Sequence, residues 1–423
     1  MPREKDSLLC GYGEAVITPP QGVDLCGYGF YLNRKAKRVR DDLKSRVLYL
    51  RRGNTGTVIV ACDLIGLTVE LSDAIREAIA KNIGLPRASV LLTCTHTHSG
   101  PAVHPMPGLG DAAPGFADKL RTIVVDTAAA AERDVRPAAA AWAFEMIEPI
   151  GYNRRTGDFR DIDPLLKTIV FDRGVDRIHL WSYACHAVVL GPGPEISADW
   201  PGAAAAALEA RGRRGVFLQG FCGDVDPVTQ AAHWGEGTRE DLELYGEIIA
   251  GRLVRAESRA VALKAATVKA DEIRVALPLQ VYSAARIGLF AASFAKRYDR
   301  FPGAARFARE WEVRALAERA DMRRDPRLLG IPGQALAIGS VKIAALPGEI
   351  FAGYAAAWRR ASDPIMPVGF ANGVVGYIPT SEAYDDPSDY AAWCAPMIYG
   401  VFPFRPDAGA ILLKRVRALL SNL

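Results

Sequence analysis

Residues 89–101 read SVLLTCTHTHSGP, an apolar and β-branched run that ends in two histidines one residue apart. Side chains two positions apart in a regular strand lie on the same face of a sheet, so His96 and His98 are expected to point together. Strand ends are also where α/β folds place their binding sites. A metal ion or an acidic partner would relieve the repulsion between two charged imidazoles. The alternative is that one histidine simply hydrogen-bonds within a polar core.

Strand-like and helix-like segments alternate on both sides of this stretch. Residues 45–52 and 55–67 are expected to form two strands, and residues 69–84 a helix that ends at a glycine. A further apolar strand is expected at 177–190, and after it a helix that begins in SADWPG with Asp199 as its N-cap. This alternation predicts an α/β fold.

The segment 286–327 differs from its surroundings because it is rich in arginine, alanine and glutamate. Its basic residues are mixed with acidic ones: Asp299, Glu310, Glu312, Glu318 and Asp321. Mixed charges of this kind favour solvated helices over a nucleic-acid surface. We therefore expect a helical insert at about 284–330 within a single domain that spans residues 1–423.

The composition excludes several classes of protein. The chain has 423 residues, half of them hydrophobic, and its 52 basic and 48 acidic side chains leave a net charge of only +4. Such a balance gives no reason to expect a nucleic-acid partner. The seven cysteines are scattered and form no CxxC pair, which argues against a disulfide scaffold or a cysteine-only zinc site.

The N-terminal residues MPREKDSLLCGYGEAV are charged and lack the apolar core of a secretory signal. No uninterrupted run of 18 apolar residues is present, so we expect no membrane span. These features predict a cytoplasmic protein with reduced thiols, and the site motifs described below predict a small-molecule substrate as its partner. A monomer and a homo-oligomer are both compatible with a chain of this size.

The other histidines differ in how strongly they suggest a site. His186 lies near the close of the strand expected at 177–190, although a lone histidine in such a place is more often structural. His179 lies seven residues earlier, would face the opposite side of a regular strand, and is interpreted as structural. His104 and His233 lie in polar or proline-rich surroundings and are left unranked.

Polar residues also gather in glycine turns where strands are expected to end. The segment GDVDP carries Asp224 and Asp226, and LPGEIF carries Glu349. Taken one at a time, each carboxylate is most simply a solvated turn residue. Tyr377 follows Gly376 near another strand end, where a tyrosine usually packs and hydrogen-bonds through its hydroxyl. Their shared position at strand exits favours a common site.

Taken together and in order, these motifs resemble the catalytic domain of neutral ceramidases. The resemblance covers about residues 11–419 and rests on many short motifs rather than on one. The motifs are GYGEAVITPP, CGYGF, DDLKSRVLYL, TCTHTHSGP, YNRR, YACHAV, SADWPG, GDVDP, LPGEIF and NGVVGYIPT. The resemblance implies a mixed β-sheet core flanked by helices and the chemistry of a zinc amidase that cleaves the N-acyl bond of ceramide.

The resemblance also implies roles for individual residues. The residues that it implies as ligands of one Zn²⁺ per chain are His96, His186, Glu349 and Tyr377. His98 matches a histidine that lines the site, and Arg154 in YNRR matches an arginine near the bound carboxylate product. Tyr384 and, with an offset of one residue, Tyr390 match tyrosines further along the chain. Nitrogen and oxygen donors of these kinds suit zinc.

Two features depart from the ceramidase pattern. Asp226 stands where the family has a serine assigned to catalysis, so we expect Asp226 to act as a general base or to bind a cationic substrate group. Asp224, two residues earlier, is a further catalytic candidate. The sequence also ends soon after the last motif and begins without an apolar leader, so we expect neither the C-terminal domain nor the secretory signal of ceramidases. A substrate smaller or more polar than ceramide is therefore expected.

The sequence predicts a zinc-dependent hydrolase that uses metal-activated water to cleave a C–N amide bond. His98, Tyr377 and Arg154 are candidates to stabilise the oxyanion that such a step forms. Alternatives are an ester or lactone hydrolase, a true ceramide N-deacylase, and a metal- or ligand-binding relative without catalysis. TIM-barrel amidohydrolases also use an HxH motif, but on their first strand, whereas several strands precede it here.

Overall fold

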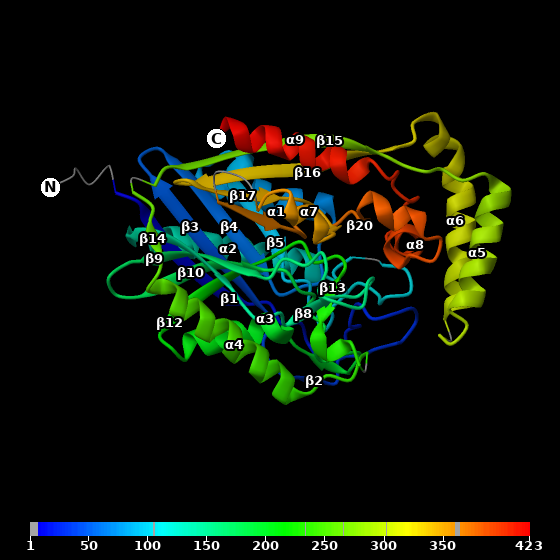
Figure 1. Cartoon of the computed structure of the whole chain (residues 1–423), viewed down its shortest axis with the longest axis horizontal. Helices are drawn as coiled ribbons and strands as arrows, with labels where there is room; N and C mark the ends of the chain where they lie inside the picture. Colours follow the sequence, from blue (N-terminus) through cyan, green and yellow to red (C-terminus); the bar gives the residue numbers. More distant parts are fainter. Residues whose placement is uncertain (1–6, 105, 233, 265, 302, 360–363) are drawn as a thin grey trace.

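The computed structural model describes residues 7–104, 106–232, 234–264, 266–301, 303–359 and 364–423, so His233 lies outside the described residues. Three larger sheets form the body of the protein, and helices cover their outer faces (Figure 1). The predicted α/β class, with mixed sheets flanked by helices, is confirmed. No described helix is both long enough and apolar enough to cross a membrane.

The first sheet contains the strand that leads to the histidine pair. Its strands, in spatial order, are β5 (Val90–Cys94), β4 (Thr55–Cys62), β3 (Lys44–Arg52), β1 (Leu9–Val16) and β6 (Arg136–Pro137). The hairpin β3–β4 is antiparallel, whereas β4 and β5 run parallel and are connected through α1 (Val69–Ile83). As expected, α1 ends at a glycine, because Gly84 adopts the left-handed conformation (φ 74°) that glycine tolerates best.

The second sheet carries the strands that precede His186 and Asp226. Its order is β12 (Arg213–Gln219), β10 (Arg177–Tyr183), β9 (Leu165–Asp172), β7 (Ala139–Met146) and β14 (Val261–Ala262). The pair β10–β12 is parallel and is joined through α3 (Asp199–Glu209), while β9–β10 is antiparallel. The carboxyl ends of β10 and β12 therefore lie side by side.

The third sheet is built from the last third of the chain. Its order is β15 (Val268–Pro278), β16 (Arg327–Ile338), β17 (Val341–Ala345) and β19 (Ile365–Val368). Three short pairs complete the described strands: β2 (Arg38–Val39) with β11 (Glu195–Ile196), β8 (Gly151–Asn153) with β13 (Val225–Pro227), and β18 (Glu349–Ile350) with β20 (Tyr377–Ile378). The last pair is parallel and sets Glu349 opposite Tyr377.

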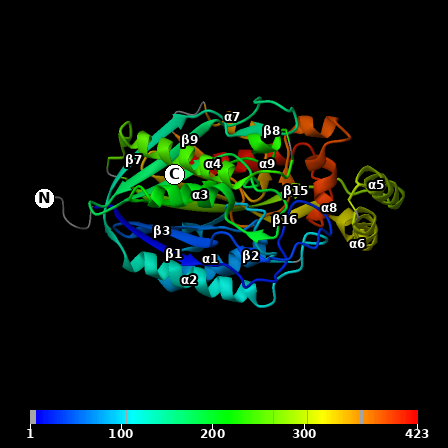
Figure 2. The ribbon, with the colours of Figure 1, turned by 90° about the horizontal axis from the view of Figure 1, so that it is seen from below.

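The three larger sheets share one apolar core between their inner faces. Leu48 of β3, Leu180 of β10 and Ile343 of β17 belong to this core, and all are fully buried. Burying one such side chain contributes about 1.5–3 kcal/mol. Figure 2 shows α2 (Phe116–Arg133) along the outer side of the first sheet, where it packs with α1. Helix α3 packs on β12 and α4 (Arg239–Glu257) packs on β7 and β9 of the second sheet, and both helices lie at the bottom of the molecule in Figure 1. Helix α9 (Ala408–Asn422) packs on β15 and β16 of the third sheet.

The expected arginine-rich helices are present as α5 (Ala284–Arg297) and α6 (Ala304–Arg324), which form a hairpin at one end of the molecule (Figure 1). Their polar faces are solvated, as predicted, but one face is apolar and buried. Phe294 of α5 and Phe307 of α6 pack around Phe30, whose ring lies 4.5 Å from that of Phe307. This aromatic cluster fixes the hairpin to the N-terminal part of the chain.

Three local predictions are wrong in detail. The strand expected at 55–67 ends at Cys62. The strand expected at 177–190 ends at Tyr183, because the chain then turns away to pair with the loop of residues 95–99. Asp199 is the first helical residue rather than the N-cap, which is Ala198. The Asp199 carboxylate instead accepts hydrogen bonds from the backbone of Val189 and Leu190 at 3.0 and 3.2 Å, and this stabilises the preceding loop.

Candidate metal centre and substrate pocket

The two histidines of the THTH motif come together, but not by strand alternation. Strand β5 ends at Cys94, and His96 has a positive φ of 65°, outside the strand conformation. This turn brings the Nε2 atoms of His96 and His98 to 3.0 Å from each other. The His96 ring also stacks on Phe370 with a centroid separation of 4.0 Å. The expected proximity is confirmed, whereas the regular strand geometry used to predict it is wrong.

Hydrogen bonds between two loops bring His186 to the same place. The Gln219 side chain, at the end of β12, donates to the carbonyl oxygens of Thr95 and Cys185 at 3.0 and 2.9 Å. Trp200 Nε1 donates to the carbonyl of His186 at 2.9 Å. All of these groups are buried, so each unmade bond would cost about 1–3 kcal/mol. These bonds hold the loop after β5, which carries His96, next to the loop after β10, which carries His186.

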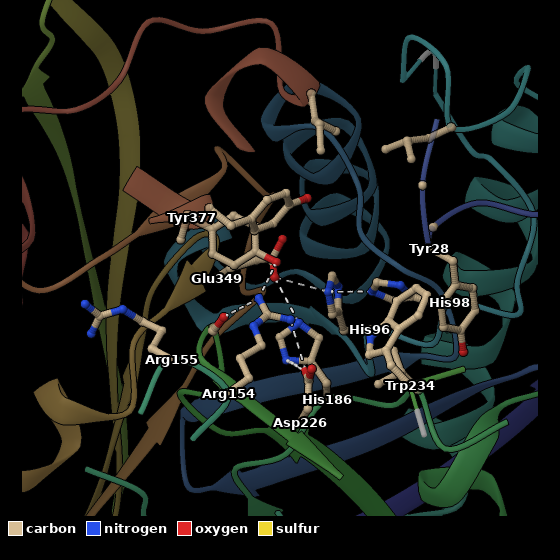
Figure 3. A pocket seen from close by; sticks show the side chains of 18 of the residues that line it. Tyr28, His96, His98, Arg154, Arg155, His186, Asp226, Trp234, Glu349 and Tyr377 are labelled. Carbon is tan, nitrogen blue, oxygen red and sulfur yellow. Dashed lines mark hydrogen bonds and ion pairs between the residues drawn. The ribbon is translucent and has the colours of Figure 1, made fainter. Parts of the chain in front are cut away.

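One carboxylate completes the cluster. The ligand atoms of His96, His98 and His186 lie within 4.8 Å of one another, a spacing at which they could hold a metal ion. Glu349 Oε2 lies 3.1 Å from His186 Nε2 and 3.4 Å from His96 Nε2. Figure 3 shows the imidazoles and this carboxylate directed toward one another.

The hydrogen bonds behind the imidazoles decide which nitrogens face the cluster. His96 Nδ1 lies 2.6 Å from the carbonyl of Ile65, and His186 Nδ1 lies 3.1 Å from that of Val225. A carbonyl only accepts, so each Nδ1 carries a proton, and in the neutral form of the imidazole Nε2 then presents a lone pair. Both lone pairs then face an acceptor, the Glu349 carboxylate. A cation between these groups removes the conflict, so the donor set fits a metal ion.

The electrostatics of the cluster agree with that geometry. Burial lowers the pKa of His96 and, together with the neighbouring imidazoles, holds the pKa of His98 well below its usual value. Burial alone would raise the pKa of Glu349, but without a metal the proton-bearing forms of His96 and His186 attract the carboxylate and donate to it, which outweighs burial and holds that pKa well below the usual range. Neutral imidazoles beside an ionised carboxylate are the protonation states in which these side chains bind metals.

Arg154 connects the cluster to Asp226. Its guanidinium donates to Asp226 Oδ1 at 3.0 Å, to the carbonyl of Gly223 at 2.8 Å and to Tyr377 Oη at 2.9 Å. Burial lowers the pKa of Arg154, but Asp226 and Tyr377 outweigh it and raise that pKa well above its usual value. Burial also raises the pKa of Tyr377, so its phenol is protonated near neutral pH. Arg154 is therefore charged beside the histidines, and its hydrogen bond to Asp226 Oδ1 connects that charge to the Asp226 carboxylate.

The cluster opens into a cavity of about 570 Å³, within the size range of small-molecule sites. Several aromatic side chains form part of its wall. Tyr28 packs edge-on against His98 and Trp234, and the Trp234 side chain is half exposed at the rim (Figure 3). Tyr390 lines the far side. The turn between α5 and α6 adds Tyr298, Arg300 and Phe301.

Most of the residues expected in the site line this cavity, namely His96, His98, Arg154, His186, Asp226, Glu349, Tyr377 and Tyr390. Asp224 and Tyr384 are not among its lining residues. Asp224 accepts from Asn153 Nδ2 and the backbone of Ala352, and burial raises its pKa to about 6. Tyr384 packs against Trp393. Both are placed to support the surrounding loops.

The lining aromatic residues that the sequence analysis did not single out include Tyr28, Trp234 and Tyr399. Tyr399 Oη donates to Glu349 Oε1 at 2.5 Å, so it contacts the candidate metal centre directly. The available signal was a tyrosine next to glycine, in CGYGF and in IYG, the same pattern that drew attention to Tyr377. Trp234 offered no comparable signal.

Comparison with solved structures identifies the architecture. A neutral ceramidase from Pseudomonas aeruginosa superposes with a TM-score of 0.72 over 99% of this chain and 75% of that one, at 17% sequence identity. The chain has a neutral-ceramidase fold. A structure described as a ceramidase complexed with C2 agrees with a TM-score of 0.73 over 99% of this chain and 76% of that one, at 16% identity. No protein-family model and no curated protein sequence matches the chain.

Proposed function

We propose that this ceramidase-like protein is a zinc-dependent hydrolase that cleaves a C–N amide bond of a small or polar substrate. The observation that supports this most directly is the convergence of His96 and His186 Nε2 on Glu349 Oε2 at the base of the aromatic cavity. Tyr377 lies opposite Glu349 in the β18–β20 pair and is the fourth proposed ligand. Zinc bound there would supply Lewis-acid polarisation of a carbonyl and a water of lowered pKa.

The protein residues around that site have complementary roles in the proposal. Arg154 and the Tyr377 hydroxyl are donors positioned to stabilise negative charge on a carbonyl oxygen, and one such donor is worth about 3 kcal/mol in an active site. Asp226 lines the cavity and is buried, with one carboxylate oxygen bound to Arg154. We assign it as the proton acceptor in the position where ceramidases have serine.

The first test is the zinc content of the purified protein, measured by plasma mass spectrometry with and without added zinc. The proposal predicts about one zinc per chain for the wild type. His186→Ala is expected to lose both the metal and the activity, because it removes a donor from the cluster. His104→Ala is the matched control, since it removes an imidazole that does not line the cavity. Full zinc occupancy in His186→Ala would refute this ligand assignment.

The second test separates the reaction classes. The zinc-loaded protein is assayed on N-acyl p-nitroanilides, on p-nitrophenyl esters with the same acyl chains, and on lactones, with detergent-dispersed ceramide as a further substrate. Amide cleavage that is abolished by chelation and restored by zinc supports the proposal. Turnover confined to esters or lactones would replace it with an esterase or lactonase. Tight zinc binding without any turnover would indicate a binding protein instead.

A further inference from the structure

The two oxygens of Glu349 have different partners. Oε2 faces the Nε2 atoms of His186 and His96, at 3.1 and 3.4 Å. Oε1 accepts a hydrogen bond of 2.5 Å from the hydroxyl of Tyr399. Because a hydroxyl bound to a carboxylate is a strong, directional donor, this bond fixes the rotation of the carboxylate about its last side-chain torsion. It thereby selects which oxygen is presented to the histidines.

The position of the Tyr399 ring is fixed by its neighbours. It follows the short helix α8 (Ala395–Ile398) and lies against Gly376, where an added Cβ would come within 3.4 Å of the Tyr399 ring carbons Cγ and Cδ2. Gly376 also has a φ of 110°, which side chains other than glycine rarely adopt. The ring of Tyr377 also packs edge-on against it, at a centroid separation of 6.3 Å. Backbone geometry therefore sets the direction of the hydroxyl.

The backbone of Glu349 is fixed from the same segment. Its N–H donates to the carbonyl of Gly376 at 3.0 Å. A glutamate backbone held in this way still leaves three side-chain torsions free, and ordering such a chain costs about 1–2 kcal/mol of entropy. The bond from Tyr399 restrains the last of these torsions. Glu349 is thus prepared in a single orientation before any ligand reaches it.

We infer that Tyr399 is a positioning residue for the metal centre, whose hydroxyl orients the Glu349 carboxylate so that Oε2 remains directed at the site between the histidines. This role rests on the proposed zinc-dependent function. It makes Tyr399 an outer partner of a metal ligand rather than a group that acts on the substrate. Loss of such a partner typically weakens metal binding 10–100-fold.

The test compares the zinc affinity of the wild type, Tyr399→Phe and Tyr282→Phe by competition with a chelating dye. Tyr282→Phe is the matched control, because it removes the hydroxyl of another buried tyrosine that does not line the cavity. Tyr399→Phe should bind zinc about 10–100-fold more weakly, whereas Tyr282→Phe should match the wild type. In the cobalt-substituted protein, Tyr399→Phe should also change the visible absorption bands, which report the ligand geometry.

The outcomes separate this role from the proposed function. If the wild type binds zinc tightly and Tyr399→Phe has the same zinc affinity and the same cobalt spectrum, the positioning role alone is overturned. A wild type that binds no zinc would overturn both. Thermal unfolding of the metal-free variants checks the fold. A Tyr399→Phe protein that matches the metal-free wild type in stability but binds zinc weakly supports the inference.

Discussion

At the scale of single residues, Asp226 is the most distinctive feature of the cavity. The residue is 3% exposed, so a charge on its carboxylate would be costly there without a partner. Arg154 supplies that partner at 3.0 Å, and the Arg154 guanidinium is in turn bound to Tyr377. The charged pair therefore joins the proposed proton acceptor to the proposed metal site through a single side chain.

Replacing Asp226 with asparagine tests the proposed proton acceptor. The amide of Asp226→Asn keeps the shape and an oxygen for Arg154, but it cannot take up a proton. We expect kcat on an amide substrate to fall about 10²–10⁴-fold, with about one zinc per chain retained. Steady-state kinetics and metal analysis of the same preparation check both expectations. An unchanged kcat would refute the catalytic role, and a rise confined to KM for cationic substrates would instead identify a binding role.

The residues of the site were predictable to different degrees for physical reasons. The THTH motif places two imidazoles within two positions, so their proximity follows from chain connectivity whatever the local conformation. The positive φ of His96 could not be predicted, because histidine rarely adopts it without support from the surrounding structure. Tyr399 is 50 residues away from Glu349 in the chain, and no spacing rule links them.

At the scale of elements, the hairpin of α5 and α6 forms part of the cavity wall as well as part of the protein surface. Mixed charges correctly predicted helices, since most side chains of these helices remain solvated. Charge patterns carry no information about the turn between two helices, and that turn supplies Tyr298, Arg300 and Phe301 to the cavity wall. The Phe30 cluster fixes the hairpin in place, and Phe30 also lines the cavity.

Phe301→Ala tests whether the hairpin turn contacts the substrate. Removing a partly buried ring from the cavity wall should cost about 1 kcal/mol of binding, which corresponds to a rise in KM of about fivefold. The zinc content should not change, because the turn lies outside the histidine cluster. Phe159→Ala, on an exposed phenylalanine that does not line the cavity, is the control. Equal KM values for the two variants would exclude the turn from substrate binding.

At the scale of the whole molecule, the arrangement of sheets explains why distant motifs meet. Strand β5 of the first sheet and strands β10 and β12 of the second direct their carboxyl ends toward one region, and Gln219 links the loops that follow β5 and β10. The α/β class followed from the alternation of segments. The division into three sheets did not, because apolar runs that are buried on both faces give no sign of which sheet they join.

The second sheet and its covering helix are held together at the opposite end by one carboxylate. Glu257, at the end of α4, accepts from Arg177 and His179 of β10 and from Arg213 of β12, at 2.5–3.1 Å. Burial would raise the pKa of Glu257, but the hydrogen bonds from these three side chains outweigh it and hold that pKa well below its usual value. The interpretation of His179 as structural agrees with this network.

Glu257→Gln should therefore lower stability in a pH-dependent way. A carboxyl group with a depressed pKa stabilises the folded state above the unfolded pKa of about 4.3, and that contribution is lost as the pH falls through the lower folded pKa. Urea unfolding should show that Glu257→Gln lowers the free energy of unfolding by about 2 kcal/mol near neutral pH. The difference in unfolding free energy between the variant and the wild type should become smaller below about pH 4. Glu243→Gln, which removes an exposed carboxylate of the same helix, should change stability by less than about 0.5 kcal/mol. If the difference in unfolding free energy between Glu257→Gln and the wild type stayed constant down to about pH 3, the role of ionised Glu257 would be contradicted. The lower stability would then come from altered packing rather than from charge.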